Sequence, residues 1–408
     1  MRILYVSPTL PTDVCRQVAA LARRGLLWKL YTSTAVNGHS VAGRLLNRWM
    51  DRRRICISDN KLRSVMLSDF QERYRLLAGK SPVEATDARF RSVDRAASHE
   101  VNGGADAVYC REDAACHTFQ RAGEEGIMRI YDLPTAHYAI TRDLIRTELE
   151  SFPELADTFP VSQEYDPPRL ARKEDELRSA DHIICPSQFV KRSLSAGGVT
   201  GDNVHVLPFA CNPAWLPESP GTRDNTVLYV GQVSTRKGVH RLLRVWKRLG
   251  AHRSHQLKLI GDMRLPNAYL AEYRGLYEHI PALPRAKLVH QYAAAKLFVA
   301  NSMSEGMAIV IPEALSTGTP VVASRNSGAE EIVTEGVDGL LVSYGDDEAL
   351  GAAIDSLLAS PQRLAYMSER AAAKARDRTW DAYERRFLSC MQSILGETSP
   401  AVEEVATA

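Results

Sequence analysis

The stretch "SEGMAIVIPEALSTGTPVVAS" (304–324) carries two carboxylates, Glu305 and Glu313, in an otherwise apolar surrounding. The apolar run LFVANS (297–302) precedes it and PVVAS (320–324) ends it, which predicts a strand, a turn, a helix and a second strand. A buried charge is costly unless a partner compensates it. The two acids are therefore expected either to face solvent or to serve a ligand.

The same alternation continues through the rest of the chain. Short apolar runs are separated by amphipathic stretches such as 15–25 and 240–250, each of which ends in a glycine. Strands that alternate with helices indicate βαβ units, and hence parallel sheets covered on both faces. The predicted strands lie at residues 3–7, 28–33, 106–110, 128–133, 182–187, 204–209, 226–232, 257–262, 297–302, 320–324 and 339–343.

The length of the chain predicts two domains. Its 408 residues exceed the roughly 250–300 at which single cores stop growing, and the Pro- and Gly-rich segment 210–225 reads as a linker. We therefore expect an α/β protein with doubly wound, Rossmann-like domains at 1–209 and 226–378, and a C-terminal helix at 379–398 that packs back on the first domain. Open α/β sheets bind ligands at the carboxyl ends of their strands, so the two domains are expected to face a central cleft.

Composition and charge exclude several classes of protein. The chain is 45% hydrophobic and 25% charged with a formal net charge of +2, so nothing predicts a nucleic-acid partner. Its seven cysteines include no C-x-x-C pair, which favours a reducing cytoplasm over a disulfide framework or zinc ribbon. The opening MRILYVSP reads as a strand rather than a signal peptide, and no apolar run is long enough to span a membrane.

The loop "VGQVSTRKG" (230–238) predicts an anion site. A strand ends there, glycines follow, and a helical pattern starts near Val239, with Arg236 and Lys237 just ahead of it. A helix N-terminus has unsatisfied amides and a partial positive charge, which together with two cations suit a diphosphate. The alternative is a solvated loop with two surface cations.

The two acids of the opening stretch can serve one elongated ligand. If a helix runs from Met307 to Ser316, Glu305 and Glu313 lie roughly 12 Å apart along its axis, too far to share a proton. Carboxylates accept hydrogen bonds from sugar or ribose hydroxyls, and the amides of 306–309 at the helix start suit a negative group between the acids. The alternative is that both are ordinary helix acids.

A basic amphipathic segment, "RLLNRWMDRRR" (44–54), precedes the second half of the first domain. Its large apolar side chains share one helical face with arginines beside them, which predicts peripheral docking on the inner face of an anionic membrane or on a lipid-linked acceptor. A solvated helix packed on the first sheet is the alternative. The apolar residues are Leu45, Leu46, Trp49 and Met50.

Together these motifs resemble the retaining glycosyltransferases of family 4, which have the GT-B fold of two Rossmann-like domains. The resemblance rests on E-x7-E followed by G-x-P-V-V-A-S, on the 230–238 loop, and on the stretches 180–194, 257–262 and 379–387. It implies transfer of a hexosyl group from a nucleotide-diphosphate sugar to an acceptor hydroxyl. The acceptor would be a glycan or lipid-linked molecule in glycan, polysaccharide or glycolipid biosynthesis.

The resemblance also implies roles for individual residues. Lys237 would neutralise the departing diphosphate, Glu305 would contact a hydroxyl of the donor sugar, and Glu313 would hold the ribose. The catalytic set is Lys237, Arg236, Glu305 and His137. The set that binds the nucleotide sugar is Glu313, Gly231, Gly306, Met307, Ala308 and Ile309, with the amides of the last three on sugar and phosphate.

The chain departs from the family pattern at several positions. The family's arginine after the loop glycine is Gln232 here, and Arg236 is the candidate to replace it. The glycine pair expected after the first strand is absent from 7–17, and E-G-F-G becomes Glu305-Gly306-Met307-Ala308. His137 aligns with a histidine that relatives place near the donor sugar, although a lone histidine is more often structural.

We therefore predict a retaining glycosyltransferase that needs no cofactor and, because the chain has no D-x-D motif, no metal. Two alternatives stay open. One is a GT-B sugar-nucleotide epimerase or phosphorylase, and the other is a degenerate member that binds a nucleotide sugar or a partner without turnover. The nucleotide base, the sugar, the acceptor and the oligomeric state are not determined by the sequence.

Overall fold

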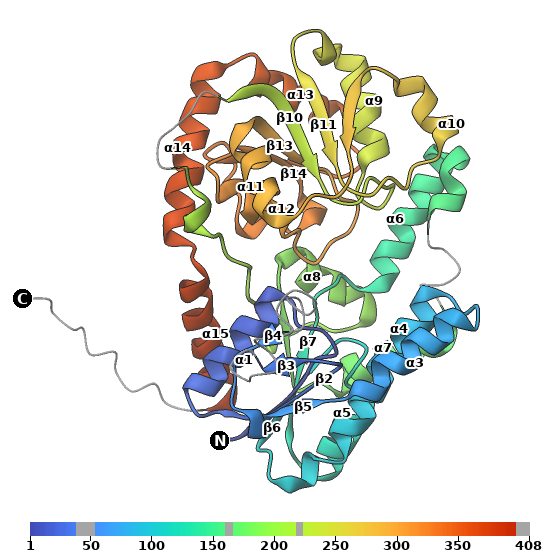
Figure 1. Cartoon of the computed structure of the whole chain (residues 1–408), viewed down its shortest axis with the longest axis vertical. Coiled ribbons are helices and arrows are strands. Elements are labelled where there is room, and N and C mark those ends of the chain that lie inside the picture. The colour runs from blue at the N-terminus through green and yellow to red at the C-terminus, as the bar shows by residue number, and fades with distance from the viewer. Residues whose placement is uncertain (38–53, 160–165, 218–222, 397–408) are drawn as a thin grey trace, which may run out of the picture. The chain divides into compact units, whose positions relative to one another are not determined.

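The computed structural model describes residues 1–37, 54–159, 166–217 and 223–396. The chain forms two compact units (Figure 1). The first unit comprises Met1–Asp132, Ala171–Ile184 and the chain from Asp381, and the second comprises Leu133–Leu170 and Cys185–Trp380. The basic segment 44–54 lies outside the described residues apart from Arg54.

The first sheet has seven strands in the order β5-β2-β1-β6-β7-β8-β9. The pairs from β5 through β8 are all parallel. All four residues of β1 are fully buried, as expected of a parallel strand covered on both faces. The strands are β1 (Ile3–Val6), β2 (Leu27–Thr32), β5 (Leu62–Ser64), β6 (Ala107–Arg111), β7 (Met128–Asp132), β8 (His182–Cys185) and β9 (Val204–Val206), and β3 (Val36–Asn37) pairs separately with β4 (Arg54–Ile55).

The helices of the first unit include the chain's last one. Gln17 on α1 donates a hydrogen bond of 2.8 Å to the hydroxyl of Tyr383 on α15, and Arg16 forms an ion pair of 3.0 Å with Glu384. The C-terminal helix is therefore anchored to α1 within this unit. The helices are α1 (Thr12–Arg23), α3 (Met66–Leu77), α4 (Pro82–Ser98), α5 (Cys116–Glu124), α7 (Pro167–Ser179) and α15 (Trp380–Leu395), of which α7 and α15 begin just before the boundary of the unit.

The second sheet has six parallel strands in the order β12-β11-β10-β13-β14-β15. Every strand that the sequence predicts in either sheet is present, but β5 of the first sheet was not predicted, and neither was β12 of the second. Its sequence YEHI is polar and only half-buried, because it forms the edge of the sheet and lacks an apolar signature. The strands are β10 (Asp224–Val230), β11 (Gln256–Ile260), β12 (Tyr277–Ile280), β13 (Ala295–Ala300), β14 (Val321–Ser324) and β15 (Gly339–Val342).

Helices cover both faces of this second sheet (Figure 1). Val227 and Tyr229 on β10 belong to the core packed under α9 and α13, whereas Leu228 and Val230 belong to the core under α11 and α12. Alternate residues of one strand thus reach opposite cores. The helices of this unit are α6 (Tyr138–Ser151), α8 (Gln188–Ser193), α9 (Val239–Leu249), α10 (Asn267–Leu270), α11 (Arg285–Ala294), α12 (Val310–Leu315), α13 (Asp347–Leu358) and α14 (Pro361–Asp377).

The segment 133–209, which the sequence analysis assigned to the first domain, is mostly grouped with the second unit. Charged side chains account for part of this grouping. The buried carboxylate of Glu148 on α6 accepts hydrogen bonds of 2.8 Å from Arg241 and lies 2.8 Å from Nε2 of His240, both on α9. A buried carboxylate held by two partners ties α6 firmly to α9.

Candidate active site

The loop between β10 and α9 adopts a conformation that requires glycine. Gly238 has φ +68°, and a Cβ atom placed on it would lie 1.7 Å from the carbonyl oxygen of Asn301. No side chain fits there, so the loop packs directly against the residue that follows β13. The amide of Met303 also donates to the carbonyl of Arg236 at 2.9 Å. These contacts bring the predicted anion loop to the turn that carries Glu305.

At this junction two cations hold one acid. Nζ of Lys237 lies 2.5 Å from Oε1 of Glu305, and Nη1 of Arg236 lies 2.6 Å from the same oxygen. The side chains of Lys237 and Glu305 are only 18% and 14% exposed. Burial lowers the pKa of Lys237, although the nearby carboxylate of Glu305 opposes this shift. The cluster keeps one excess positive charge, which suits an anion.

The turn at Gly306 is also packed too closely for a side chain. A Cβ atom on Gly306 would lie 1.6 Å from the carbonyl oxygen of Pro134. The amide of Ala308 donates to the carbonyl of Ser327 at 2.8 Å, so the protein itself uses this amide. Within the described ranges, no hydrogen bond to another group of the protein occupies the amides of Gly306, Met307 and Ile309. These three amides therefore make no contact with the described residues that would compete with a ligand for them.

The helix of the opening stretch begins later than predicted. The sequence analysis expected it to start at Met307, but α12 runs from Val310 to Leu315. The bond from Ala308 to Ser327 holds the preceding residues in a turn. Pro312 therefore falls in the first turn, where the helix needs no amide from it, so this proline does not break the helix.

Glu313 belongs to a second group of contacts on α12. Its carboxylate accepts a hydrogen bond of 3.1 Å from the hydroxyl of Tyr292 and lies 3.3 Å from Nη2 of Arg285. Burial raises its pKa, while Arg285 and Tyr292 act in the opposite direction. The guanidinium of Arg285 in turn lies over the ring of Trp215, 4.8 Å from its centroid. Both oxygens of Glu313 are thus oriented by neighbours.

The loop that starts at Gly231 contains one residue that the sequence analysis did not single out. Gly231 has φ +140° and donates its amide to Ile260 at 2.9 Å. Gln232 is exposed, with its carbonyl accepting from Tyr229 at 2.7 Å. The hydroxyl of Ser234 is buried and has no hydrogen-bond partner in the described part of the chain. Such an unpaired buried polar group is uncommon in a folded protein.

His137 has a structural role in the same unit. It is the N-cap residue of α6, where Nδ1 accepts from the amide of Ala139 at 3.3 Å, and its ring stacks on Tyr138. Its segment adjoins the Glu305 turn, since Oγ1 of Thr141 and Oγ of Ser304 are 2.8 Å apart. The capping contact agrees with the structural alternative. A contact from His137 to a ligand stays a prediction.

The first unit has its own charged cluster at the ends of β6 and β7. Nη1 of Arg111 lies 2.7 Å from Asp132 and 3.1 Å from Asp13. Burial raises the pKa of Asp132 to about 6, although Arg111 opposes the shift. Asp13 and Arg111 were missed by the sequence analysis, even though each lies shortly after a predicted strand. In an open parallel sheet this edge binds ligands.

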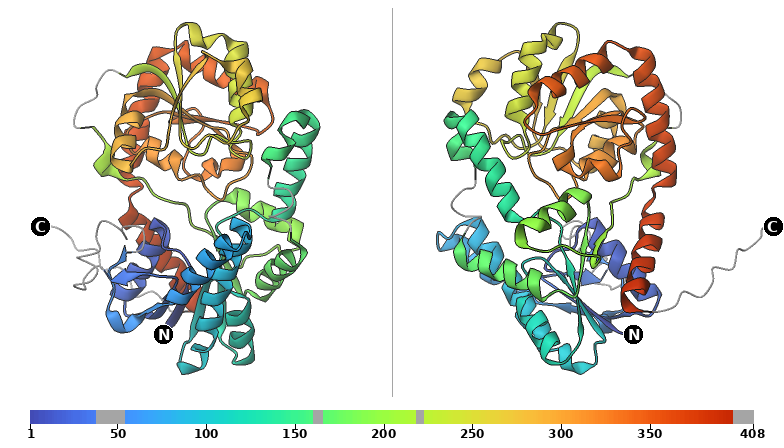
Figure 2. Two further views of the ribbon diagram at one scale, coloured as in Figure 1. Left: turned by 45° about the vertical axis from the view of Figure 1, so that its right-hand side comes forward. Right: turned by 180° about the vertical axis from the view of Figure 1, so that it is seen from behind.

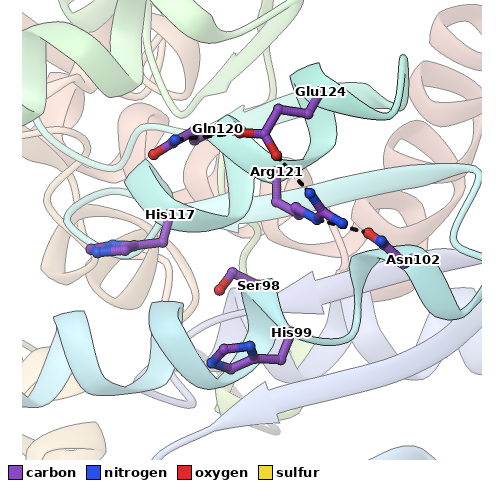
Figure 3. Close-up of a pocket in the computed structure, with 7 residues that line it drawn as sticks. All are labelled: Ser98, His99, Asn102, His117, Gln120, Arg121 and Glu124. Carbon is purple, nitrogen blue, oxygen red and sulfur yellow. Dashed lines mark hydrogen bonds and ion pairs between the residues drawn. The ribbon is translucent and has the colours of Figure 1, made fainter.

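A polar cavity of about 390 Å³ lies beside α5, also in the first unit. Figure 3 shows that the charged groups lining it pair with their neighbours: Arg121 with Glu124 and with Asn102. His117 contacts Asp94 at 2.9 Å. Among the residues that the structure describes, no group of three or more His, Cys, Asp or Glu is arranged to hold a metal. That the chain needs no cofactor and no metal stays a prediction.

Two parallel-sheet, Rossmann-like domains with these connections form the GT-B fold. Sucrose-phosphate synthase from Thermosynechococcus elongatus matches with a TM-score of 0.63 and 17% identity, over 98% of this chain and 100% of that one. Anabaena HepE in complex with UDP-glucose matches with a TM-score of 0.62 and 17% identity, over 96% of this chain and 100% of that one. At such identities the likeness shows the fold alone.

Residues 217–374 match the model of the family described as glycosyl transferases group 1. The D-inositol 3-phosphate glycosyltransferase of Segniliparus rotundus is 32% identical over 42% of this chain and 40% of its own length. The alpha-maltose-1-phosphate synthase of Mycolicibacterium smegmatis is 31% identical over 46% of this chain and 56% of its own length. The chain thus matches about half the length of these relatives.

Proposed function

We propose that the chain is a glycosyltransferase that moves a sugar from a nucleotide-diphosphate sugar to an acceptor hydroxyl with retention. The observation that carries the proposal is the cluster of Arg236, Lys237 and Glu305, which lies inside the matched group 1 domain. Its excess positive charge fits a departing diphosphate. The glycosyltransferase names of the relatives and the UDP-glucose bound to HepE support the same reading.

The donor diphosphate would replace Glu305 as the partner of the two cations. In the cluster both cations contact one oxygen of Glu305. A diphosphate offers several anionic oxygens, so it competes well for both cations. Glu305, once released, can accept a hydrogen bond from a hydroxyl of the donor sugar. Ser234 and the amides of Gly306 and Met307 are placed to donate to the same ligand.

The reaction needs positioning and charge stabilisation. The bond from the anomeric carbon to the phosphate oxygen breaks as the acceptor oxygen bonds to that carbon from the same face. The proton of the acceptor hydroxyl passes to the leaving diphosphate, which Arg236 and Lys237 stabilise. Glu313 would hold the ribose, with its carboxylate oriented by Tyr292 and Arg285. No nucleophile from the protein takes part.

We propose that the group that accepts the sugar is a hydroxyl of a glycan or of a lipid-linked molecule. The peripheral membrane contact predicted through 44–54 stays a prediction, because residues 38–53 lie outside the described part. Within that described part, no helix is both long and apolar enough to cross a bilayer.

The test is an assay of product formation with UDP-, GDP- and ADP-sugars and candidate acceptors, read by NMR at the anomeric carbon. Release of nucleoside diphosphate together with a glycoside of unchanged anomeric configuration supports the proposal. An epimerised sugar nucleotide would favour the epimerase instead. Nucleotide binding in calorimetry without release of the sugar from any donor would favour the degenerate member, for which Gln232 is the supporting feature.

A further inference from the structure

Helix α3 of the first unit exposes an apolar face to solvent. It lies side by side with α4 in each view (Figure 2). Of the nine large apolar side chains that are exposed in the described part of the chain, six belong to this one helix. Five of them, each between 56% and 80% exposed, are Met66, Leu67, Phe70, Tyr74 and Leu77.

These five side chains form one continuous stripe. Leu67, Phe70, Tyr74 and Leu77 follow the spacing i, i+3, i+7 and i+10, which places them on a single face of a helix. Single exposed apolar residues are ordinary on a protein surface, but a contiguous stripe marks an interaction site. The stripe is therefore a candidate docking surface.

The face of α3 that packs on the protein is polar instead. Arg89 on α4 forms ion pairs of 3.5 Å with Asp69 and 3.1 Å with Glu72. Gln71 also accepts a hydrogen bond of 2.6 Å from Ser92 on α4. A helix of a globular domain usually buries its apolar face. On α3, polar contacts hold the helix against α4 while its apolar face is exposed.

A cationic groove runs beside the apolar stripe. It is a cavity of about 490 Å³ between α3 and α4, and Tyr74 belongs to both the stripe and the groove. None of the described residues that line it is an acid, although Glu84 lies 3.8 Å from Lys80 and Asp87 lies 3.0 Å from Arg91. The cations that line the groove are Arg75, Lys80, Arg91 and Arg95.

We propose that α3 docks in the surface of a bilayer that contains anionic phospholipid. The apolar stripe enters the boundary between headgroups and acyl chains, and the groove at Arg75 and Lys80 takes a headgroup phosphate. Apolar side chains on one face with cations beside them match the two components of binding at an anionic membrane surface. This docking surface is separate from segment 44–54 and from the cluster at Lys237.

Flotation of the whole chain with vesicles tests the proposal. Vesicles of phosphatidylcholine alone are compared with vesicles of phosphatidylcholine mixed with phosphatidylglycerol. The wild-type chain is expected to float with the mixed vesicles. The double variant Arg75→Gln/Lys80→Gln should bind them about 25-fold more weakly, since each cation near an anionic surface contributes about fivefold. Leu67→Ser/Phe70→Ser should weaken binding by at least about tenfold.

Matched controls replace similar side chains elsewhere. Tyr366→Ser removes an exposed aromatic ring of the second unit, and Arg178→Gln removes an exposed cation of the first. Both controls should float like the wild type. Added NaCl should release the wild type more than the Arg75/Lys80 variant, because salt screens the charge contribution. Circular dichroism melts confirm that each variant is folded.

Several results would overturn the proposal. The wild-type chain could fail to float with the mixed vesicles, or the α3 variants could float as it does. Light scattering could also show that the wild type is a dimer which Leu67→Ser/Phe70→Ser converts to a monomer without changing flotation. In that case the stripe would be an interface between copies of the chain rather than a lipid-binding surface.

Discussion

Each of the two units has a charged cluster at the carboxyl ends of its strands, and the two clusters have net charges of opposite sign. In the second unit Arg236 and Lys237 hold the single acid Glu305, which leaves an excess positive charge. In the first unit Asp13 and Asp132 hold a single cation and leave an excess negative charge. The same strand–loop–helix architecture therefore provides one edge suited to an anion and one suited to groups that donate hydrogen bonds.

This contrast assigns different ligands to the two units. A diphosphate is attracted to the positive cluster and repelled by the negative one, whereas hydroxyl groups can donate to carboxylates. The donor is therefore proposed for the second unit and the acceptor for the first. Substitutions that invert or remove the charge of either cluster test this assignment.

The largest effect is expected from Arg111→Met. It leaves the buried carboxylates of Asp13 and Asp132 close together without their cation. Removal of one partner from a buried ion pair costs about 3–5 kcal/mol in the free energy of unfolding, measured by urea denaturation. The control Arg121→Met removes a surface pair with Glu124 and should cost about 0–1 kcal/mol. If both variants lose the same small amount of unfolding free energy, the cluster of Arg111, Asp13 and Asp132 does not stabilise the first unit.

Lys237→Met is expected to lower turnover by about 10²–10³-fold, as for the loss of one group that stabilises developing charge. Product formation with the preferred donor measures this effect.

Glu313→Ala should mainly weaken nucleotide affinity, since its proposed role is on the ribose. The control Lys247→Met removes an exposed lysine of α9. Unchanged transfer and unchanged nucleotide affinity in both site variants would contradict the proposed function.

The first cluster predicts a dependence of stability on pH. Burial raises the pKa of Asp132 from 3.8 to about 6, so the folded state binds this proton more tightly than the unfolded state does. The resulting stabilisation is complete below pH 3.8 and is lost as the pH rises to about 6. Its size is on the order of 3 kcal/mol. Asp132→Asn should remove this component from urea titrations at several pH values, and an identical profile in both proteins would refute it.

The smallest effect is expected from Gln232→Arg, which introduces the arginine that the family resemblance implies into the loop 230–238. Gln232 is exposed, so an added cation there gains only about 0.2–1 kcal/mol, or up to about fivefold in affinity for a nucleoside diphosphate. Gln256→Arg, at an exposed position of β11, is the control. A weaker affinity in Gln232→Arg would show that this position does not face the diphosphate.

The sequence predicted the sheets well because buried parallel strands are continuous apolar runs. It missed β5 and β12, two short strands that lie at the edges of their sheets. It placed the start of α12 three residues early, because the bond from Ala308 to Ser327 joins two distant segments. Local sequence patterns do not predict contacts between segments that are far apart in the chain.

The sequence predicted some residues of the candidate site and missed others. Lys237 and Glu305 were singled out because each lies in a glycine-containing loop after a strand. The grouping of Asp13 with Arg111 was missed, because it depends on which strands are neighbours in the sheet. The apolar face of α3 reverses the usual rule that such a face is buried, so periodicity alone would have assigned it to the core.

The central claim is that a diphosphate replaces Glu305 as the partner of Arg236 and Lys237. Calorimetric titration of UDP, GDP and ADP into the wild type and Glu305→Gln tests it most directly. Glu305→Gln is expected to bind the preferred nucleoside diphosphate more tightly, because the cations are no longer neutralised, while transfer of the sugar falls. Equal or weaker binding by Glu305→Gln would contradict the claim.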